Sequence, residues 1–189
     1  ALDVTNNRAV VSNETGRMFI VDLTTNTLAQ AVDGALSSSG LVINNDILYV
    51  LDTATESVMV FDMNALVAPV SPPEGVDESA FILASIGVGS VPYSLALDAV
   101  TNRLYVANYG EDSISVIDLN TYLEIDRIFL DQDNISTNFL RDGEGPVDVA
   151  LGTFNGTTYL FVACFAAHDV VMINTQTLNV VEVFPNTAE

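Results

Sequence analysis

The chain has 189 residues, of which 49% are hydrophobic, and its formal net charge is −20. This length is enough for a domain with a sizeable core, and the hydrophobic content excludes a disordered acidic chain. The five basic residues are all arginines and face 25 acidic residues, so the chain lacks the clustered cations that nucleic acid or an anionic membrane surface requires. The acidic charge is the kind that keeps an apolar β-rich protein in solution.

Two features of the sequence exclude other classes of protein. The longest apolar run, residues 159–167, has about nine residues, whereas a membrane-spanning helix needs roughly 20. Cys164 is the only cysteine, so an intrachain disulfide is excluded. No long segment has helical periodicity, which favours an all-β fold.

Four related segments follow one another along the chain, approximately residues 1–35, 36–85, 86–142 and 143–187. The first opens with ALDVTNNRAVVSN, which aligns without a gap with ALDAVTNRLYVAN in the third. A polar residue that ends the third predicted strand recurs 40, 56 and 56 residues apart; these residues are Asp22, Asp62, Asp118 and Asn174. A unit of about 40 residues with four short strands is the period of a β-propeller blade. Insertions at residues 68–81 and 131–145 account for the two longer spacings, and both are expected to follow the fourth strand of one blade and to precede the first strand of the next.

The third segment illustrates the strands that we expect in each blade. Apolar runs at residues 93–98, 104–107 and 114–119 alternate with polar turns, and a more polar strand follows at residues 122–130. The two central runs are apolar on both faces, which indicates that both faces of the sheet are covered. The sequence therefore predicts an all-β propeller domain of about four four-stranded antiparallel blades.

The third segment resembles the YVTN family of β-propeller repeats, which is related to the NHL and WD40-like propellers. It reads VPYSLALDAVTNRLYVANYGEDSISVIDLNT at residues 91–121, and the other segments follow this pattern more loosely. The resemblance covers most of the chain and implies the propeller fold. It implies less about function, because members serve as scaffolds in archaeal surface-layer proteins, as periplasmic electron-transfer domains and as lactonase-like enzymes.

The blade number leaves ring closure open. Propellers of the family commonly have seven blades, and an open ring leaves two apolar blade faces in water. Three arrangements are consistent with about four blades. The chain is part of a larger propeller, or copies and other chains complete the ring, or four blades close a ring by themselves.

The recurring Asp22, Asp62, Asp118 and Asn174 are predicted to be structural turn caps. An Asp or Asn side chain at such a position accepts hydrogen bonds from the backbone of the following turn. A catalytic carboxylate would not be needed in every blade. His168, the only histidine, is predicted to be a solvated turn residue, and Cys164 a small buried hydrophobic residue.

The insertions supply the candidate interaction loops, whose acidic residues are Glu74, Asp77, Glu78, Asp142 and Glu144. Asp131 and Asp133 begin like a calcium-binding loop, but Ile135 occupies the next expected ligand position. Asn13, Asn134 and Asn155 begin Asn-x-Ser/Thr sequons and are candidates for glycosylation.

These observations predict a non-enzymatic module, extracellular, at the cell surface or periplasmic, which serves as a scaffold or protein-interaction unit. Its expected partners are another protein or further copies or blades of the same protein, with calcium as a further candidate. We predict no catalytic residue and no cofactor. The alternative is a periplasmic lactonase-like or cofactor-binding redox propeller whose active site lies largely on blades outside this chain.

Overall fold

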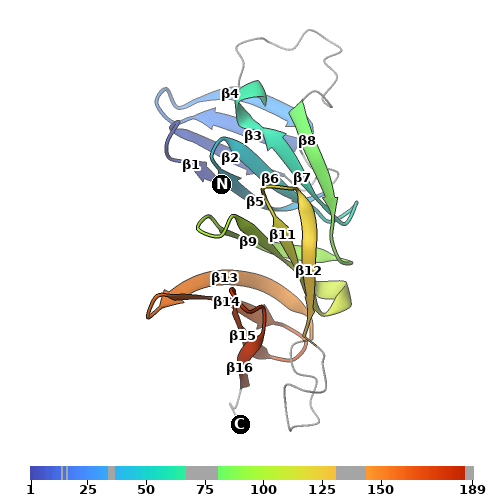
Figure 1. Ribbon diagram of the computed structural model, residues 1–189. Coiled ribbons are helices and arrows are strands. Elements are labelled where there is room, and N and C mark those ends of the chain that lie inside the picture. The colour runs from blue at the N-terminus through green and yellow to red at the C-terminus, as the bar shows by residue number, and fades with distance from the viewer. Residues whose placement is uncertain (14, 16, 34–36, 67–80, 131–143, 186–189) are drawn as a thin grey trace. The chain divides into compact units, whose positions relative to one another are not determined.

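The computed structural model describes residues 1–13, 15, 17–33, 37–66, 81–130 and 144–185. These residues form four antiparallel sheets of four strands each, and every sheet is built from consecutive strands of the chain (Figure 1). This confirms the predicted all-β fold of four propeller blades. Short helical turns, α1 (Met63–Leu66) and η2 (Tyr109–Glu111), follow strands of blades 2 and 3.

The strands have the following bounds. Blade 1 contains β1 (Leu2–Asp3), β2 (Arg8–Ser12), β3 (Arg17–Asp22) and β4 (Thr27–Asp33). Blade 2 contains β5 (Ser38–Asn44), β6 (Ile47–Asp52), β7 (Ser57–Asp62) and β8 (Ile82–Gly87). Blade 3 contains β9 (Pro92–Asp98), β10 (Arg103–Asn108), β11 (Ser113–Asp118) and β12 (Leu123–Phe129). Blade 4 contains β13 (Pro146–Phe154), β14 (Thr157–Cys164), β15 (Asp169–Asn174) and β16 (Val180–Pro185).

The predicted position of the first insertion is wrong. Residues 68–81 come between β7 and β8 along the chain, before the fourth strand of blade 2, because residues 82–87 form that strand and pair with β7. Residues 131–145 come between β12 and β13, as predicted.

The chain forms two compact units, Ala1–Gly87 with blades 1 and 2 and Val88–Glu189 with blades 3 and 4. Each unit has its own apolar core between its two blades. The core of the first unit is formed by Val10, Met18, Ile20, Val32, Leu48, Val50, Phe61, Met63 and Leu66. The core of the second unit includes Tyr105, Ala107, Ile114, Val116, Leu160, Val162, Val171 and Ile173. The blade pair is therefore the packing unit of the structure.

Alternation along the strands shows which blade face each core uses. In β3, Met18 and Ile20 are buried in the core of the first unit, whereas Phe19 and Val21 are half-buried on the opposite face. The same alternation occurs in β15 of blade 4. In β10 every residue from Leu104 to Asn108 is buried, as expected for a strand that is apolar on both faces.

The turns between the first and second strands of the blades use the left-handed backbone conformation. Asn7, Asp46, Asn102 and Asn155 occupy these turns with φ of 53°, 63°, 55° and 50°. Asn and Asp tolerate this conformation better than other non-glycine residues, because their short polar side chains bond locally. The Asn-Arg pairs that recur in the sequence thus fix a tight turn directly before β2 and β10.

Gly145, at the entry to blade 4, should not tolerate a side chain. Its φ is +68°, and a Cβ atom would lie 3.0 Å from Ala166 Cβ and 3.1 Å from Tyr109 Cε2. We expect Gly145→Ala to lower the free energy of unfolding by about 3 kcal/mol through backbone strain and crowding together. Urea unfolding followed by circular dichroism measures the loss.

Gly156 provides the matched control, because its φ is +78° but a Cβ atom there would meet no heavy atom within 4 Å. Gly156→Ala should therefore cost only the backbone strain, about 1 kcal/mol. Equal losses in the two variants would contradict the role assigned to crowding around Gly145.

Candidate functional site

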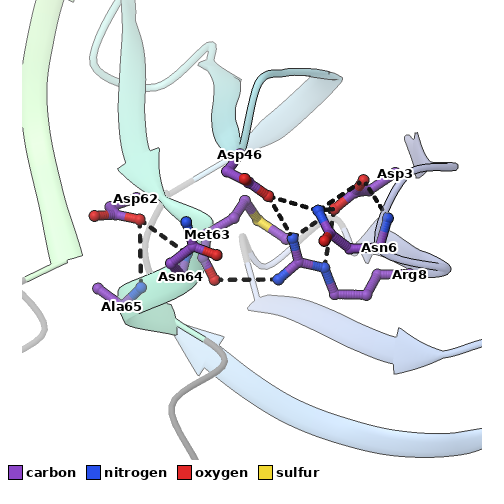
Figure 2. Close-up of polar contacts among 8 residues, drawn as sticks. All are labelled: Asp3, Asn6, Arg8, Asp46, Asp62, Met63, Asn64 and Ala65. Atoms are coloured by element: carbon purple, nitrogen blue, oxygen red, sulfur yellow. Dashed lines mark hydrogen bonds and ion pairs between the residues drawn. The ribbon is translucent and has the colours of Figure 1, made fainter.

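A buried arginine joins the two blades of the first unit (Figure 2). Arg8, at the start of β2 in blade 1, is bound by Asp3 of the same blade, and its Nε lies 2.9 Å from Asp3 Oδ2. Its guanidinium also donates to Asp46 Oδ1 at 2.8 Å and to the backbone carbonyl of Met63 at 3.4 Å, both in blade 2. A buried guanidinium needs such partners, because removing it from water is costly.

Carboxylates surround this arginine from both blades. Asn6 donates to Asp46 Oδ1 at 2.6 Å and to Asp3 Oδ2 at 3.0 Å, which fixes the two carboxylates around Arg8. Burial opposes ionisation of Asp3, but hydrogen bonds from Arg8 and Asn6 outweigh it and lower the pKa of Asp3. Asp3 therefore stays ionised opposite the guanidinium.

The second unit repeats one contact of this arrangement. Arg103, which aligns with Arg8, donates from blade 3 to the backbone carbonyl of Thr175 in blade 4 at 3.0 Å. Met63 and Thr175 occupy equivalent places, directly after the last residue of β7 and of β15. The position of Arg8 and Arg103 in the blade is occupied by Ile47 in blade 2 and by Tyr159 in blade 4, as the strand registers show. The arginine is thus found in the first blade of each pair.

The structure places the recurring residues at the ends of β3, β7, β11 and β15 over the following turns. Asp22 Oδ1 accepts hydrogen bonds from the backbone N–H groups of Thr24 and Thr25 at 2.7 and 3.2 Å. Equivalent bonds to the backbone N–H two residues along the chain are made by Asp62 (2.8 Å), Asp118 (2.7 Å) and Asn174 (2.9 Å). Backbone hydrogen bonds from Thr24 and Thr25 lower the pKa of Asp22.

Cys164 and His168 lie near each other in the chain but in different environments. Cys164 is buried in the core of the second unit, and burial raises the pKa of its thiol. His168 is exposed in the turn after β14, with φ of +59°, and its ring centroid lies 6.2 Å from that of Phe165. A thiol with a raised pKa is a poor nucleophile, so the environment of Cys164 suits packing.

The remaining candidates divide between described and undescribed residues. Six of them lie outside the described residues: Glu74, Asp77, Glu78, Asp131, Asp133 and Asp142; Asn134 also lies there. Glu144 is half-buried, and its backbone carbonyl accepts a hydrogen bond from Ala167 at 3.2 Å. Asn13 and Asn155 are both exposed, and Asn13 Oδ1 accepts from the backbone of Thr15. Among the described residues, no group of three or more His, Cys, Asp or Glu side chains could hold a metal ion.

Two blade faces carry apolar side chains that are only partly buried. On blade 1 the cross-strand pairs Val11–Phe19 and Ala9–Val21 lie on the face opposite the core. On blade 4 the pairs Phe161–Met172 and Ala163–Val170 likewise lie on the face opposite the core of their own unit. These residues occupy the sheet positions that alternate with buried core residues, so they have the chemistry of a blade interface. We call them the open faces of blades 1 and 4.

The sequence did not indicate the role of Arg8 and Arg103, although both were visible in the aligned copies of the repeat. The available signal was the recurrence of Asn-Arg at the same place in the first and third segments. Recognising it as a contact between blades requires the position of the neighbouring sheet. The sequence did predict apolar residues on both faces of the central strands, which is the pattern that produces the open faces.

Comparison with known proteins supports the fold. No protein-family model matches the chain, and no curated protein matches it. Similar solved structures include the hydrazine synthase of Kuenenia stuttgartiensis, with 19% identity and a TM-score of 0.72 over 94% of this chain and 46% of that chain. The WD40 repeats of RRP9 match with 9% identity and a TM-score of 0.72 over 96% of this chain and 48% of that chain.

BamB from Moraxella catarrhalis is also similar, with 13% identity, a TM-score of 0.59 and coverage of 96% of this chain and 50% of that chain. At these identities the likeness shows the fold alone. The chain thus has a β-propeller fold and spans about half the length of the solved chains that it matches. In the part of the chain that the structure describes, no helix has the length and apolar character needed to cross a membrane.

Replacing Arg8 should weaken the first unit more than replacing Arg103 weakens the second. Arg8→Ala leaves two carboxylates without their buried partner and should cost about 3 kcal/mol. Arg103→Ala removes one hydrogen bond to a carbonyl and should cost about 1 kcal/mol. Native-state hydrogen exchange read by mass spectrometry resolves the two units. Losses within about 0.5 kcal/mol for Arg8→Ala would contradict its role, because exposed surface substitutions cost that much.

The stability of the chain should fall in acid partly through Asp3. Its folded pKa is lowered, so its contribution is complete above the unfolded pKa, near 4, and is lost as pH falls through the folded pKa. Asp3→Asn should reduce both stability at pH 7 and the change in stability between about pH 5 and pH 2. Urea unfolding at a series of pH values measures both quantities.

Asp22→Asn is the control for this experiment. The pKa of Asp22 is also lowered, so the variant should likewise reduce the pH dependence. Asn keeps the oxygen that accepts the turn hydrogen bonds, as Asn174 does, so stability at pH 7 should stay unchanged. A loss at pH 7 as large as that of Asp3→Asn would contradict the distinction between a turn cap and a buried ion pair.

Proposed function

We propose that this chain is a YVTN-type assembly module of a larger β-propeller, acting as a scaffold without catalysis at the cell surface or outside the cell. The observation that carries the proposal is the pair of open faces on blades 1 and 4. Within each unit, the sheet positions that are equivalent to those of an open face are buried in an apolar core against the neighbouring blade. The natural occupant of an open face is therefore another blade.

The arrangement of the apolar residues supports this occupant. Val11 is 55% exposed, yet it lies beside Phe19 and alternates with the core residue Val10. Burial of apolar surface contributes roughly 25 cal/mol per Å², so two such faces gain by covering each other. The solved propellers that the chain resembles are about twice its length, which is consistent with further blades in the complete ring.

The YVTN motif and the lysine-free acidic composition support the extracellular assignment and the scaffold role. Residues 91–121 carry the motif most completely. Labelling of intact source cells with an antibody against the chain tests the location. Signal that appears only after the cells are permeabilised would overturn the extracellular assignment.

Charged substitutions on the open faces should abolish association. In dilute solution we expect the chain to form particles heavier than its own 20.2 kDa, because each open face covers an apolar face of another copy. Val11→Asp on blade 1 or Val170→Asp on blade 4 should shift the particles toward the mass of one chain. Light scattering after gel filtration measures the mass, and circular dichroism verifies the fold.

Val100→Asp is the matched control, because Val100 is 93% exposed in the turn after β9 and does not belong to either open face. It should leave the mass unchanged. A parent chain that keeps the mass of one copy at all concentrations and binds no apolar dye would show that the faces do not dock blades.

A further inference from the structure

We propose a second interaction surface at the turn end of blades 3 and 4, which binds a cationic segment of a partner protein through exposed aromatic rings and carboxylates. We define the aromatic surface as Tyr93, Tyr109, Phe165 and His168. This surface is distinct from the open faces of blades 1 and 4, because its residues lie at the entry to β9 and in the turns that follow β10 and β14. It goes beyond the proposed assembly function and does not depend on it.

Strand pairing brings these residues to one end of the two blades. Pro92, at the start of β9, pairs with Asn108, at the end of β10, so Tyr93 and Tyr109 lie at the same end of blade 3. Their ring centroids are 6.2 Å apart. In blade 4, Pro146 at the start of β13 pairs with Cys164 at the end of β14, which places Phe165 at the corresponding end.

Gly145 connects the aromatic residues of the two blades. A Cβ atom on Gly145 would lie 3.1 Å from the ring of Tyr109 and 3.0 Å from Ala166. The backbone N–H of Phe165 donates to the Gly145 carbonyl at 2.8 Å. The ring of Tyr109 and the backbone of Phe165 therefore both lie against Gly145, which brings the aromatic residues of blades 3 and 4 to one backbone segment.

The aromatic side chains are exposed although they are large. Tyr93 is 53% exposed and Phe165 is 65% exposed. Single exposed hydrophobic residues are ordinary, but several that gather in one region mark interaction sites, in which aromatic residues are enriched. Aromatic rings also offer their faces to cations, and each such contact contributes measurably to binding.

Carboxylates lie against the backbone segments that carry these rings. Asp148 accepts a hydrogen bond from the hydroxyl of Ser94, the neighbour of Tyr93, at 2.7 Å. Asp112 accepts from the backbone N–H of Gly145 at 2.7 Å, and Glu144 precedes that glycine. Charge complementarity thus selects a partner segment that carries arginine or lysine.

Arg127 neutralises only part of this acidic group. Its guanidinium contacts Glu111, two residues after Tyr109, at 2.7 Å and Glu124 at 2.8 Å. Arg127 does not pair with Asp112 or Asp148 in these contacts. Each of these two carboxylates accepts hydrogen bonds from the protein through one of its oxygens. The surface keeps an excess of negative charge in the part of blades 3 and 4 that the structure describes.

Backbone hydrogen bonds join the two segments that carry Tyr93 and Tyr109. Val91 adopts φ of +48°, a conformation that a β-branched residue rarely takes. Its carbonyl accepts from the N–H of Tyr109 at 3.0 Å, and the carbonyl of Ser90 accepts from Gly110 at 3.0 Å. These bonds tie the entry of β9 to η2, so Tyr93 and Tyr109 are pre-organised, which reduces the entropic cost of binding.

Binding is tested with the whole chain and a synthetic fluorescent peptide in which arginine and lysine alternate with glycine and serine. The control peptide carries glutamine in place of each basic residue. Fluorescence anisotropy at about 150 mM salt limits long-range attraction to the net charge, because the Debye length is then about 8 Å. We expect the basic peptide to bind and the glutamine peptide not to bind.

Matched variants localise the contact. Tyr93→Ala and Phe165→Ala should each weaken binding about threefold to tenfold, and Tyr93→Phe should retain it because the ring remains. Asp148→Asn should weaken binding and reduce its dependence on salt. Phe154→Ala is the control, because Phe154 is 70% exposed at the opposite end of β13.

Two results would overturn the proposal. One is equal binding of the basic and glutamine peptides, and the other is an equal loss of binding in Phe154→Ala and Phe165→Ala. Val11→Asp separates this proposal from the assembly function, because it should change the mass of the particles and leave peptide binding intact. Failure of either proposal is therefore seen independently of the other.

Discussion

The structure depends on one packing constraint, which is that a four-stranded sheet with apolar side chains on both faces needs a partner on each face. Within each unit one face of each blade meets the neighbouring blade, and residues such as Ile20 and Leu48, or Val116 and Leu160, share a core. The alternation along β3 and β15 follows from this constraint, because the residues between the core positions point to the other face. The packing of the blades in pairs and the open faces of blades 1 and 4 are therefore consequences of the same sequence pattern.

Polar groups specify how the apolar faces meet. Buried charge is costly unless its partners are supplied, so the Arg8 guanidinium fixes where the carbonyl of Met63 and the carboxylate of Asp46 must lie. Turn caps and left-handed Asn residues hold the strand ends that carry these groups. The apolar cores supply the stability of each pair, and the polar contacts determine the register between its blades.

The sequence predicted those features that repeat along the chain. Strands, turns and blade number follow from periodicity, and the recurring Asp22 and Asp118 indicate turn ends because each blade presents them at the same place. The contact of Arg8 with Met63 could not be predicted in this way, since it joins residues of different sheets. The aromatic surface was missed for the same reason. Tyr93, Tyr109 and Phe165 come together only through strand pairing and the contact at Gly145, which no local sequence pattern specifies.

The alternation of arginine between blades has a consequence for how such a chain can be rearranged. Blades 1 and 3 carry the arginine, and blades 2 and 4 carry the carbonyl that receives it, with Ile47 and Tyr159 at their own equivalent positions. A single blade moved elsewhere would carry either an arginine without its carbonyl acceptor or a carbonyl without its arginine donor. A pair moved as a whole keeps donor and acceptor together. Gene duplication or recombination that acts on pairs would therefore preserve this chemistry, because the pair is the shortest segment that carries both the arginine and its acceptor.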